Sequence, residues 1–155
     1  MTVRHVGSAL ALLLLASTAR AQAVPELRAD AFLGRTSGAQ LGLGVALDAG
    51  GYTRLALIVG AGAERRPGGA LVGVQRAEAV ARFHFDPLRQ TRHGVYAGGG
   101  IGARHTPGGP LRALLVALLG VEGPPHGGIA AAVEAGVGGG ARVGVVLRRA
   151  RTQRR

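Results

Sequence analysis

The feature of the sequence that most restricts the fold is a strict alternation of apolar and charged residues, which is clearest from Ala77 to Phe85. The odd positions of this stretch are all alanine or phenylalanine, whereas the even positions include Glu78, Arg82 and His84. Successive side chains of a β-strand point to opposite faces, so a period of two predicts a strand that lies between two different environments. The polar stretch at 86–93 predicts a turn.

The same parity recurs along the chain in segments separated by short, glycine-rich and proline-rich turns. Eight such segments follow one another, at 26–34, 40–48, 52–64, 71–85, 94–104, 111–122, 129–137 and 141–148. They predict an all-β fold, an eight-stranded antiparallel up-and-down β-barrel, or meander. The segment 111–122 also permits a buried helix, because its apolar run has no decisive periodicity.

Charge separates the two faces of the predicted strands. Within the eight segments every Arg, Asp, Glu and His occupies an even position, and the odd positions are almost wholly apolar, with Thr53 and Gln75 the polar exceptions. An apolar wall outside and charges inside would make a transmembrane barrel. The opposite arrangement would make a soluble sandwich or lipocalin-like barrel. The even face is too rich in charge for a dry core, so we favour the transmembrane barrel.

The even face has matched charges. It includes six arginines, at 28, 54, 76, 82, 112 and 142, and six carboxylates, at 26, 30, 64, 78, 122 and 134. Charges in a narrow interior need partners. We therefore predict a network of charges in the lumen that includes Arg28, Asp30, Arg54, Glu78, Arg82, His84, Arg112, Glu134 and Arg142. An eight-stranded barrel has room inside only for side chains, so no open pore is expected.

The amino-terminal residues 1–23 have the pattern of a secretory signal. Arg4 and His5 precede an apolar run at 9–16, and small residues then allow cleavage after Ala23 or, alternatively, Ala21. The run is shorter than a membrane-spanning helix, which needs roughly 20 apolar residues. The predicted organisation is a signal peptide at 1–23, a barrel at 24–148 and a basic tail at 149–155.

The composition of the exported chain argues against several kinds of partner and site. It has 17 arginines against 8 carboxylates, a formal charge of +9, but no nucleic-acid-binding motif accompanies this charge, so we expect no nucleic-acid partner. The chain has no cysteine, which removes disulfides and thiolate metal sites.

The segment 94–104, GVYAGGGIGAR, is similar to the Y-x-G-x-G-x-G strand of small eight-stranded outer-membrane β-barrel proteins of Gram-negative bacteria, and the chain resembles that family from 26 to 148. The resemblance implies an outer-membrane location, periplasmic termini, a monomer, and outer-membrane lipid or lipopolysaccharide as partner. The chain departs from the family in ending with arginines, in its short loops and in its few girdle aromatics, chiefly Phe83 and Phe85.

With this orientation a basic rim would face the cell exterior. It would contain Arg35, Arg65, Arg66, Arg104 and His105. Arginine pairs well with phosphate, so the rim could bind anionic lipopolysaccharide. Ordinary solvated turn charges are the alternative. Phe83 and Phe85 would anchor the periplasmic side in lipid.

The residues of the chain give little support for a catalytic function. The exported chain has a single serine, Ser37, in a turn, and His84 is predicted at the opposite end of the barrel, so they could not form a nucleophile and base. No metal-ligand spacing or nucleotide-binding motif is present, and we expect no catalytic residue, metal or cofactor. The sequence predicts a non-enzymatic outer-membrane barrel with an envelope-structural or surface-interaction role. The alternative is a soluble periplasmic lipocalin-like barrel that binds a small apolar ligand.

Overall fold

The computed structural model describes residues 23–86 and 92–150. The predicted signal segment, apart from its last residue, and residues 151–155 of the predicted tail lie outside the described residues, as does part of the predicted turn at 86–93.

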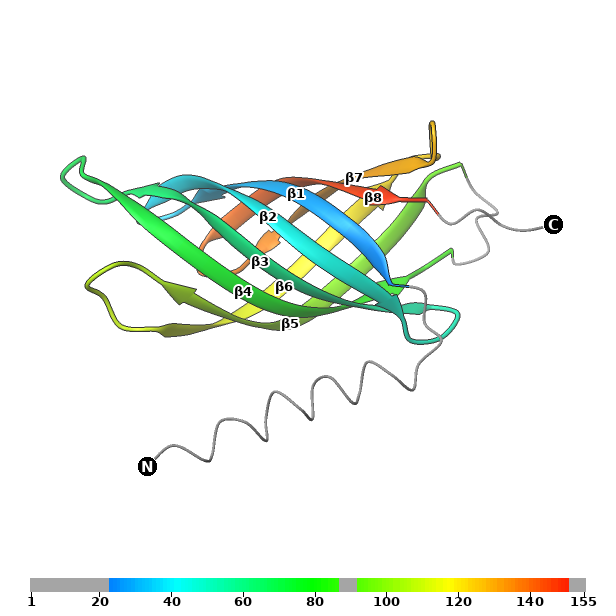
Figure 1. Cartoon of the computed structure of the whole chain (residues 1–155), viewed down its shortest axis with the longest axis horizontal. Helices are drawn as coiled ribbons and strands as arrows, with labels where there is room; N and C mark the ends of the chain where they lie inside the picture. Colours follow the sequence, from blue (N-terminus) through cyan, green and yellow to red (C-terminus); the bar gives the residue numbers. More distant parts are fainter. Residues whose placement is uncertain (1–22, 87–91, 151–155) are drawn as a thin grey trace, which may run out of the picture.

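Eight antiparallel strands close into one barrel in which each strand pairs with its neighbours in the sequence and β8 pairs with β1 (Figure 1). The strands are β1 (Val24–Leu33), β2 (Ser37–Asp48), β3 (Thr53–Arg65), β4 (Leu71–His84), β5 (Gly94–His105), β6 (Arg112–Glu122), β7 (Ile129–Val137) and β8 (Ala141–Arg149). The predicted eight-stranded meander barrel is confirmed. The segment that also permitted a helix is strand β6, because its backbone completes the ladders with β5 and β7.

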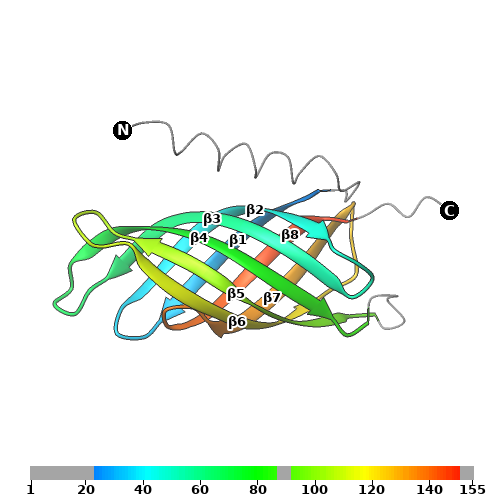
Figure 2. The ribbon, with the colours of Figure 1, turned by 90° about the horizontal axis from the view of Figure 1, so that it is seen from below.

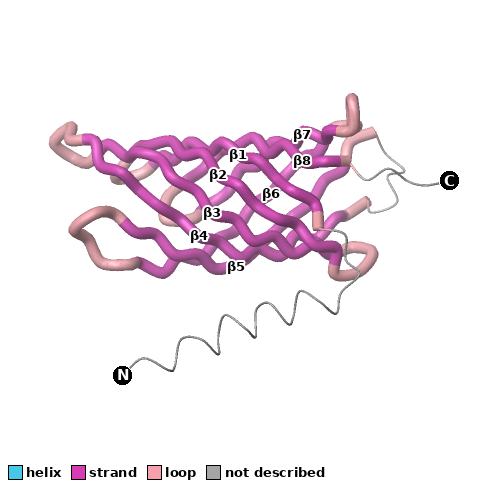
Figure 3. The backbone as a smooth tube through the Cα atoms, in the orientation of Figure 1, coloured by secondary structure: helices cyan, strands magenta, loops and turns pink. Residues whose placement is uncertain are grey.

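The two ends of the barrel differ in the chain segments that they carry (Figures 1 and 2). One end, here called the hairpin end, carries the connections β1–β2, β3–β4, β5–β6 and β7–β8. The other, the terminus end, carries the remaining three connections together with the start of β1 and the end of β8. Figure 3 shows that the loops lie only at these two ends and that strands make up the wall.

Strand pairing preserves the parity of the sequence around the whole barrel. Every cross-strand partner of an even residue is even, and every partner of an odd residue is odd, as in Arg28 with Gly42 and Leu27 with Leu43. Directly opposed residues share one face of a sheet. One face of the barrel is therefore made entirely of even residues, and a slip by one residue in any pair would turn a strand inside out.

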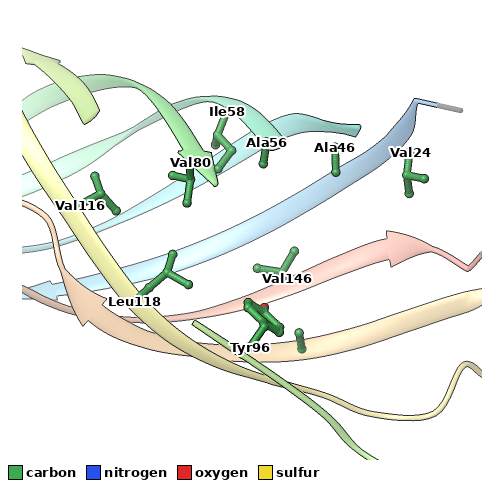
Figure 4. Packing of buried hydrophobic residues seen from close by; sticks show 10 residues of the cluster. Val24, Ala46, Ala56, Ile58, Val80, Tyr96, Val116, Leu118 and Val146 are labelled. Carbon is green, nitrogen blue, oxygen red and sulfur yellow. The ribbon is translucent and has the colours of Figure 1, made fainter. Parts of the chain in front are cut away.

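The even residues face the interior. All the buried side chains are even-numbered, whereas the large apolar side chains at odd positions, such as Leu41, Leu57 and Ile101, are exposed on the outer wall. Apolar interior residues form one cluster from several strands (Figure 4). Its members are Val24, Ala46, Ala56, Ile58, Val80, Tyr96, Val116, Leu118, Ala132 and Val146.

Glycines on the even face make room for the large interior side chains. Arg28 lies opposite Gly42, Arg82 opposite Gly98, and Tyr96 opposite Gly120. A methyl group at position 120 would collide with the ring of Tyr96, and one at position 42 would lie 3.0 Å from Cγ of Arg28. The alternating glycines therefore set the volume of the interior, which is narrow in an eight-stranded barrel.

Adjacent glycines of β5 offer a test of this packing. A Cβ at the inward position Gly100 would collide with the backbone oxygen of Ala79, whereas at the outward position Gly99 its nearest neighbour is the oxygen of Val116 at 3.8 Å. We expect Gly100→Ala to lower the free energy of unfolding by about 1–3 kcal/mol through overpacking. Gly99→Ala should change it little. Urea titration of the purified protein measures both changes, and equal effects would contradict the assignment of faces.

Candidate functional site

The centre of the interior is organised around Glu134 of β7. Its carboxylate accepts hydrogen bonds from Nη2 of Arg28 at 3.0 Å and from the hydroxyl of Tyr96 at 2.8 Å. Nη2 of Arg82 lies 3.1 Å from the same carboxylate. Glu134 is fully buried, so side chains from β1, β4 and β5 together supply the stabilisation that water would otherwise give.

Two further groups of charges flank this centre on β1. Toward the hairpin end, Asp30 accepts two hydrogen bonds from Arg28, at 2.7 and 2.8 Å, and one from Nε2 of Gln40 at 3.0 Å. Toward the terminus end, Glu26 lies between Arg82, at 2.9 Å, and Arg148, at 3.1 Å. Since Arg28 and Arg82 both also contact Glu134, the charges form one connected network across the lumen.

The network continues to both mouths of the barrel. Near the hairpin end Arg142 donates two hydrogen bonds to Glu78, at 2.7 and 2.9 Å, and Arg104 donates to Glu64. Near the terminus end Nη1 of Arg148 donates to Glu122 at 2.5 Å. Arg54 pairs with Asp48 at 3.0 Å, and their side chains are still partly exposed to solvent.

The ion pairs balance. Among residues 23–86 and 92–150, seven arginines pair with seven carboxylates: Arg28, Arg54, Arg76, Arg82, Arg104, Arg142 and Arg148 with Glu26, Asp30, Asp48, Glu64, Glu78, Glu122 and Glu134. The interior is therefore formally neutral, which an enclosed space of low polarity requires. The positive charge of the chain lies outside this network.

The structure places eight of the nine proposed lumen residues inside the barrel or at its mouth. Arg28, Asp30, Glu78, Arg82, Glu134 and Arg142 are buried. Arg54 and His84 are half-buried near the terminus end, where the ring of His84 packs 5.1 Å from that of Tyr96.

Arg112 does not belong to the lumen. It is the first residue of β6 and is exposed at the hairpin end, directly opposite Arg104. Parity alone places it on the inward face, but the wall ends here and the side chain extends into solvent. Arg104, proposed for the outer rim, instead bonds to Glu64 in the mouth.

Three interior residues of the network were not predicted from the sequence. Tyr96 donates to Glu134, Gln40 donates to Asp30, and the ring of Phe32 lies under the guanidinium of Arg76 at 3.9 Å. All three are even-numbered residues within the predicted segments. Their even positions indicate the inward face, but the predicted network contained only charged residues and histidine.

Positively charged side chains gather at the hairpin end, in the turns and beside them. Arg35, Arg65, Arg66 and His105 are exposed there, and Arg112 joins them. The four connections at this end, 34–36, 66–70, 106–111 and 138–140, contain no Asp or Glu. The basic rim therefore consists of these five residues.

Aromatic side chains gather on the outer wall at the terminus end. The rings of Tyr52 and Phe83 stack with centroids 5.6 Å apart, and Phe85 meets Phe83 edge-on at 5.8 Å. All three side chains are about half exposed. Tyr52 was not predicted for the outer wall, because it is the even-numbered first residue of the predicted segment 52–64, whereas β3 begins at Thr53.

The residues considered for catalysis lie apart. Ser37 begins β2 at the hairpin end, and His84 ends β4 at the terminus end. Among residues 23–86 and 92–150, no cluster of three or more His, Cys, Asp or Glu could hold a metal ion. The described part of the chain also has no helix long and apolar enough to cross a membrane.

A scan against protein-family models finds no match for this chain, and a search of curated proteins finds no significant one.

The network predicts a large difference between central and peripheral ion pairs. Glu134→Gln leaves Arg28 and Arg82 buried with a neutral partner, so we expect a loss of about 3–5 kcal/mol in the free energy of unfolding. Asp48→Asn alters a partly exposed pair at the mouth and should cost less than about 1 kcal/mol. Denaturant unfolding followed by circular dichroism measures both changes in the free energy of unfolding. A larger loss for Asp48→Asn would contradict the central role of Glu134.

Proposed function

We propose that this protein spans the outer membrane as a closed, non-enzymatic β-barrel with a lumen plugged by side chains, in an envelope-structural or surface-interaction role. The observation that carries the proposal is the inverted distribution of polarity. The outer wall exposes rows of Leu, Val and Ile, while a charge network fills the interior. Soluble monomers rarely expose continuous apolar surfaces of this extent, whereas lipid requires them.

Strand dimensions support the same location. The strands contain 9 to 14 residues, and a tilted strand crosses the hydrocarbon core with about 9–11. Closure of the barrel leaves no unpaired strand edge, which is the condition for β-structure in lipid.

The ends of the barrel support an orientation. The aromatic cluster of Tyr52, Phe83 and Phe85 at the terminus end has the amphipathic character of a membrane-interface girdle. The basic rim at the hairpin end suits the phosphates of lipopolysaccharide. We therefore place the hairpin end outside the cell and the termini in the periplasm, as in the resembled family.

The filled interior supports a structural or surface role. Side chains as large as Arg28, Arg82, Arg142 and Tyr96 are almost completely buried within it, which supports a lumen closed to solutes. A lipocalin-like protein would need an apolar interior for its ligand. The charges of this lumen make that alternative less well supported.

Arginine substitutions on the outer wall distinguish a lipid-facing surface from a water-facing one. Leu57, 56% exposed, lies near the middle of β3, and Leu33, 60% exposed, lies at the hairpin end of β1. In lipid vesicles Leu57→Arg should destabilise the barrel by about 2–4 kcal/mol and Leu33→Arg by about 0–1 kcal/mol.

The measurement is the free energy of unfolding in phosphatidylcholine vesicles, with heat-modifiable migration as the assay for the folded barrel. A soluble protein would tolerate both arginines on an exposed wall. Release of the wild-type protein as a soluble monomer by osmotic shock would also count against the proposal.

A further inference from the structure

We propose that the outer wall over β2 to β5 binds one phosphate-bearing lipid, with an acyl chain in an apolar groove and the phosphate at the basic rim. This inference rests on the proposed membrane location and adds a defined lipid site to it.

The groove is a pair of connected hollows on the outside of the barrel. The first has a volume of about 680 Å³ and the second about 630 Å³. Both are lined by Leu43, Val59, Ala77 and Ala103, so they form one depression along the wall. The second hollow, toward the middle of the wall, has a predominantly apolar lining, which suits a hydrocarbon chain.

Side-chain size along β4 explains the depression. Ala77 and Ala79 are the outward residues at the middle of this strand, and they lie opposite Val59 and Leu57 of β3. On the other side, Ala79 lies opposite Ile101 of β5. Ala77 lies opposite another small residue, Ala103 of β5. These small outward residues beside larger ones leave a shallow valley that suits an extended acyl chain.

The hairpin end of the groove is polar. Gln75 and His105 line it there and lie directly opposite each other on β4 and β5. Parity alone would assign His105 to the lipid-facing wall, where a polar side chain is otherwise unfavourable. Leu111, also in the lining, precedes the exposed Arg112.

Charge complementarity identifies the lipid. Arg65, Arg66 and Arg112 lie at this same end, and the hairpin connections contain no carboxylate to neutralise them. Arginine binds phosphate oxygens through charge-assisted hydrogen bonds. A lipid that lies in the groove with its headgroup at the hairpin end would bring its phosphate to these side chains.

A second copy of the chain fits the groove less well. Two copies inserted in the same direction would bring their basic rims together, and like charges would oppose the contact. A lipid therefore complements both the apolar groove and the positive charge of the rim, whereas a second copy could complement only the groove.

Native mass spectrometry of the detergent-solubilised protein tests the site. The probes are phosphatidylglycerol and phosphatidylcholine with identical acyl chains. The wild type should retain one phosphatidylglycerol about tenfold more tightly than phosphatidylcholine, as expected for charge-assisted hydrogen bonds.

Two sets of variants separate the groove from the rim. The double variant Ala77→Phe, Ala103→Phe fills the groove, and Ala131→Phe, Ala135→Phe is its control on the outer wall of β7. The triple variant Arg65→Gln, Arg66→Gln, Arg112→Gln neutralises the rim, and Arg92→Gln, Arg149→Gln is its control at the terminus end. Both site variants should abolish the preference, and both controls should retain it.

Other outcomes overturn the proposal. Equal retention of the two lipids excludes headgroup recognition, and a preference unaffected by filling the groove excludes the groove. A dimer that disappears when the groove is filled identifies a second copy as the occupant. Flotation of the wild type with vesicles is measured first: failure to float overturns the membrane location as well, whereas flotation without lipid preference overturns the lipid site alone.

Discussion

Burial of charge in a narrow lumen is the constraint on which the rest of this structure depends. In the described part of the chain, seven arginines and seven carboxylates pair inside the eight-stranded barrel and at its mouths. The fully buried Glu134 contacts side chains from four other strands. An unpaired charge there would be strongly destabilising. Two sets of interactions therefore fix the register of the strands. One is the backbone hydrogen-bond ladder, and the other is the pairing of inward side chains across the lumen.

The same constraint explains the composition of the chain. Large inward residues such as Arg28 and Arg82 each have a glycine as one of their cross-strand neighbours, and this leaves room for their side chains in a narrow lumen. Neutrality of the interior leaves the excess positive charge to the two ends. On the proposed membrane location, the hairpin end becomes an anion-binding surface without any dedicated loop, and the apolar wall beside it becomes a lipid site.

The barrel itself was predictable from sequence because parity is preserved through every turn, so one rule assigned both the strands and their faces. Parity could not locate the ends of the wall. It therefore predicted Arg112 in the lumen, whereas the side chain is exposed at the hairpin end, and it could not show that Arg104 bonds to Glu64 in the mouth. It also could not pair the charges, since Arg28 and Glu134 are distant in the chain and meet only when β7 and β1 close around the lumen. The groove was missed because it depends on relative side-chain size across three strands.

Single-cysteine scanning along β6 tests the central claim most directly, since the chain has no cysteine of its own. Each position from Ala113 to Val121 is labelled in turn with an environment-sensitive fluorophore, and the protein is reconstituted in vesicles that contain brominated lipid. We expect bromine quenching at odd positions, strongest at mid-strand, and little quenching at even positions. Odd positions that escape quenching and react freely with a water-soluble maleimide in the folded barrel would contradict it.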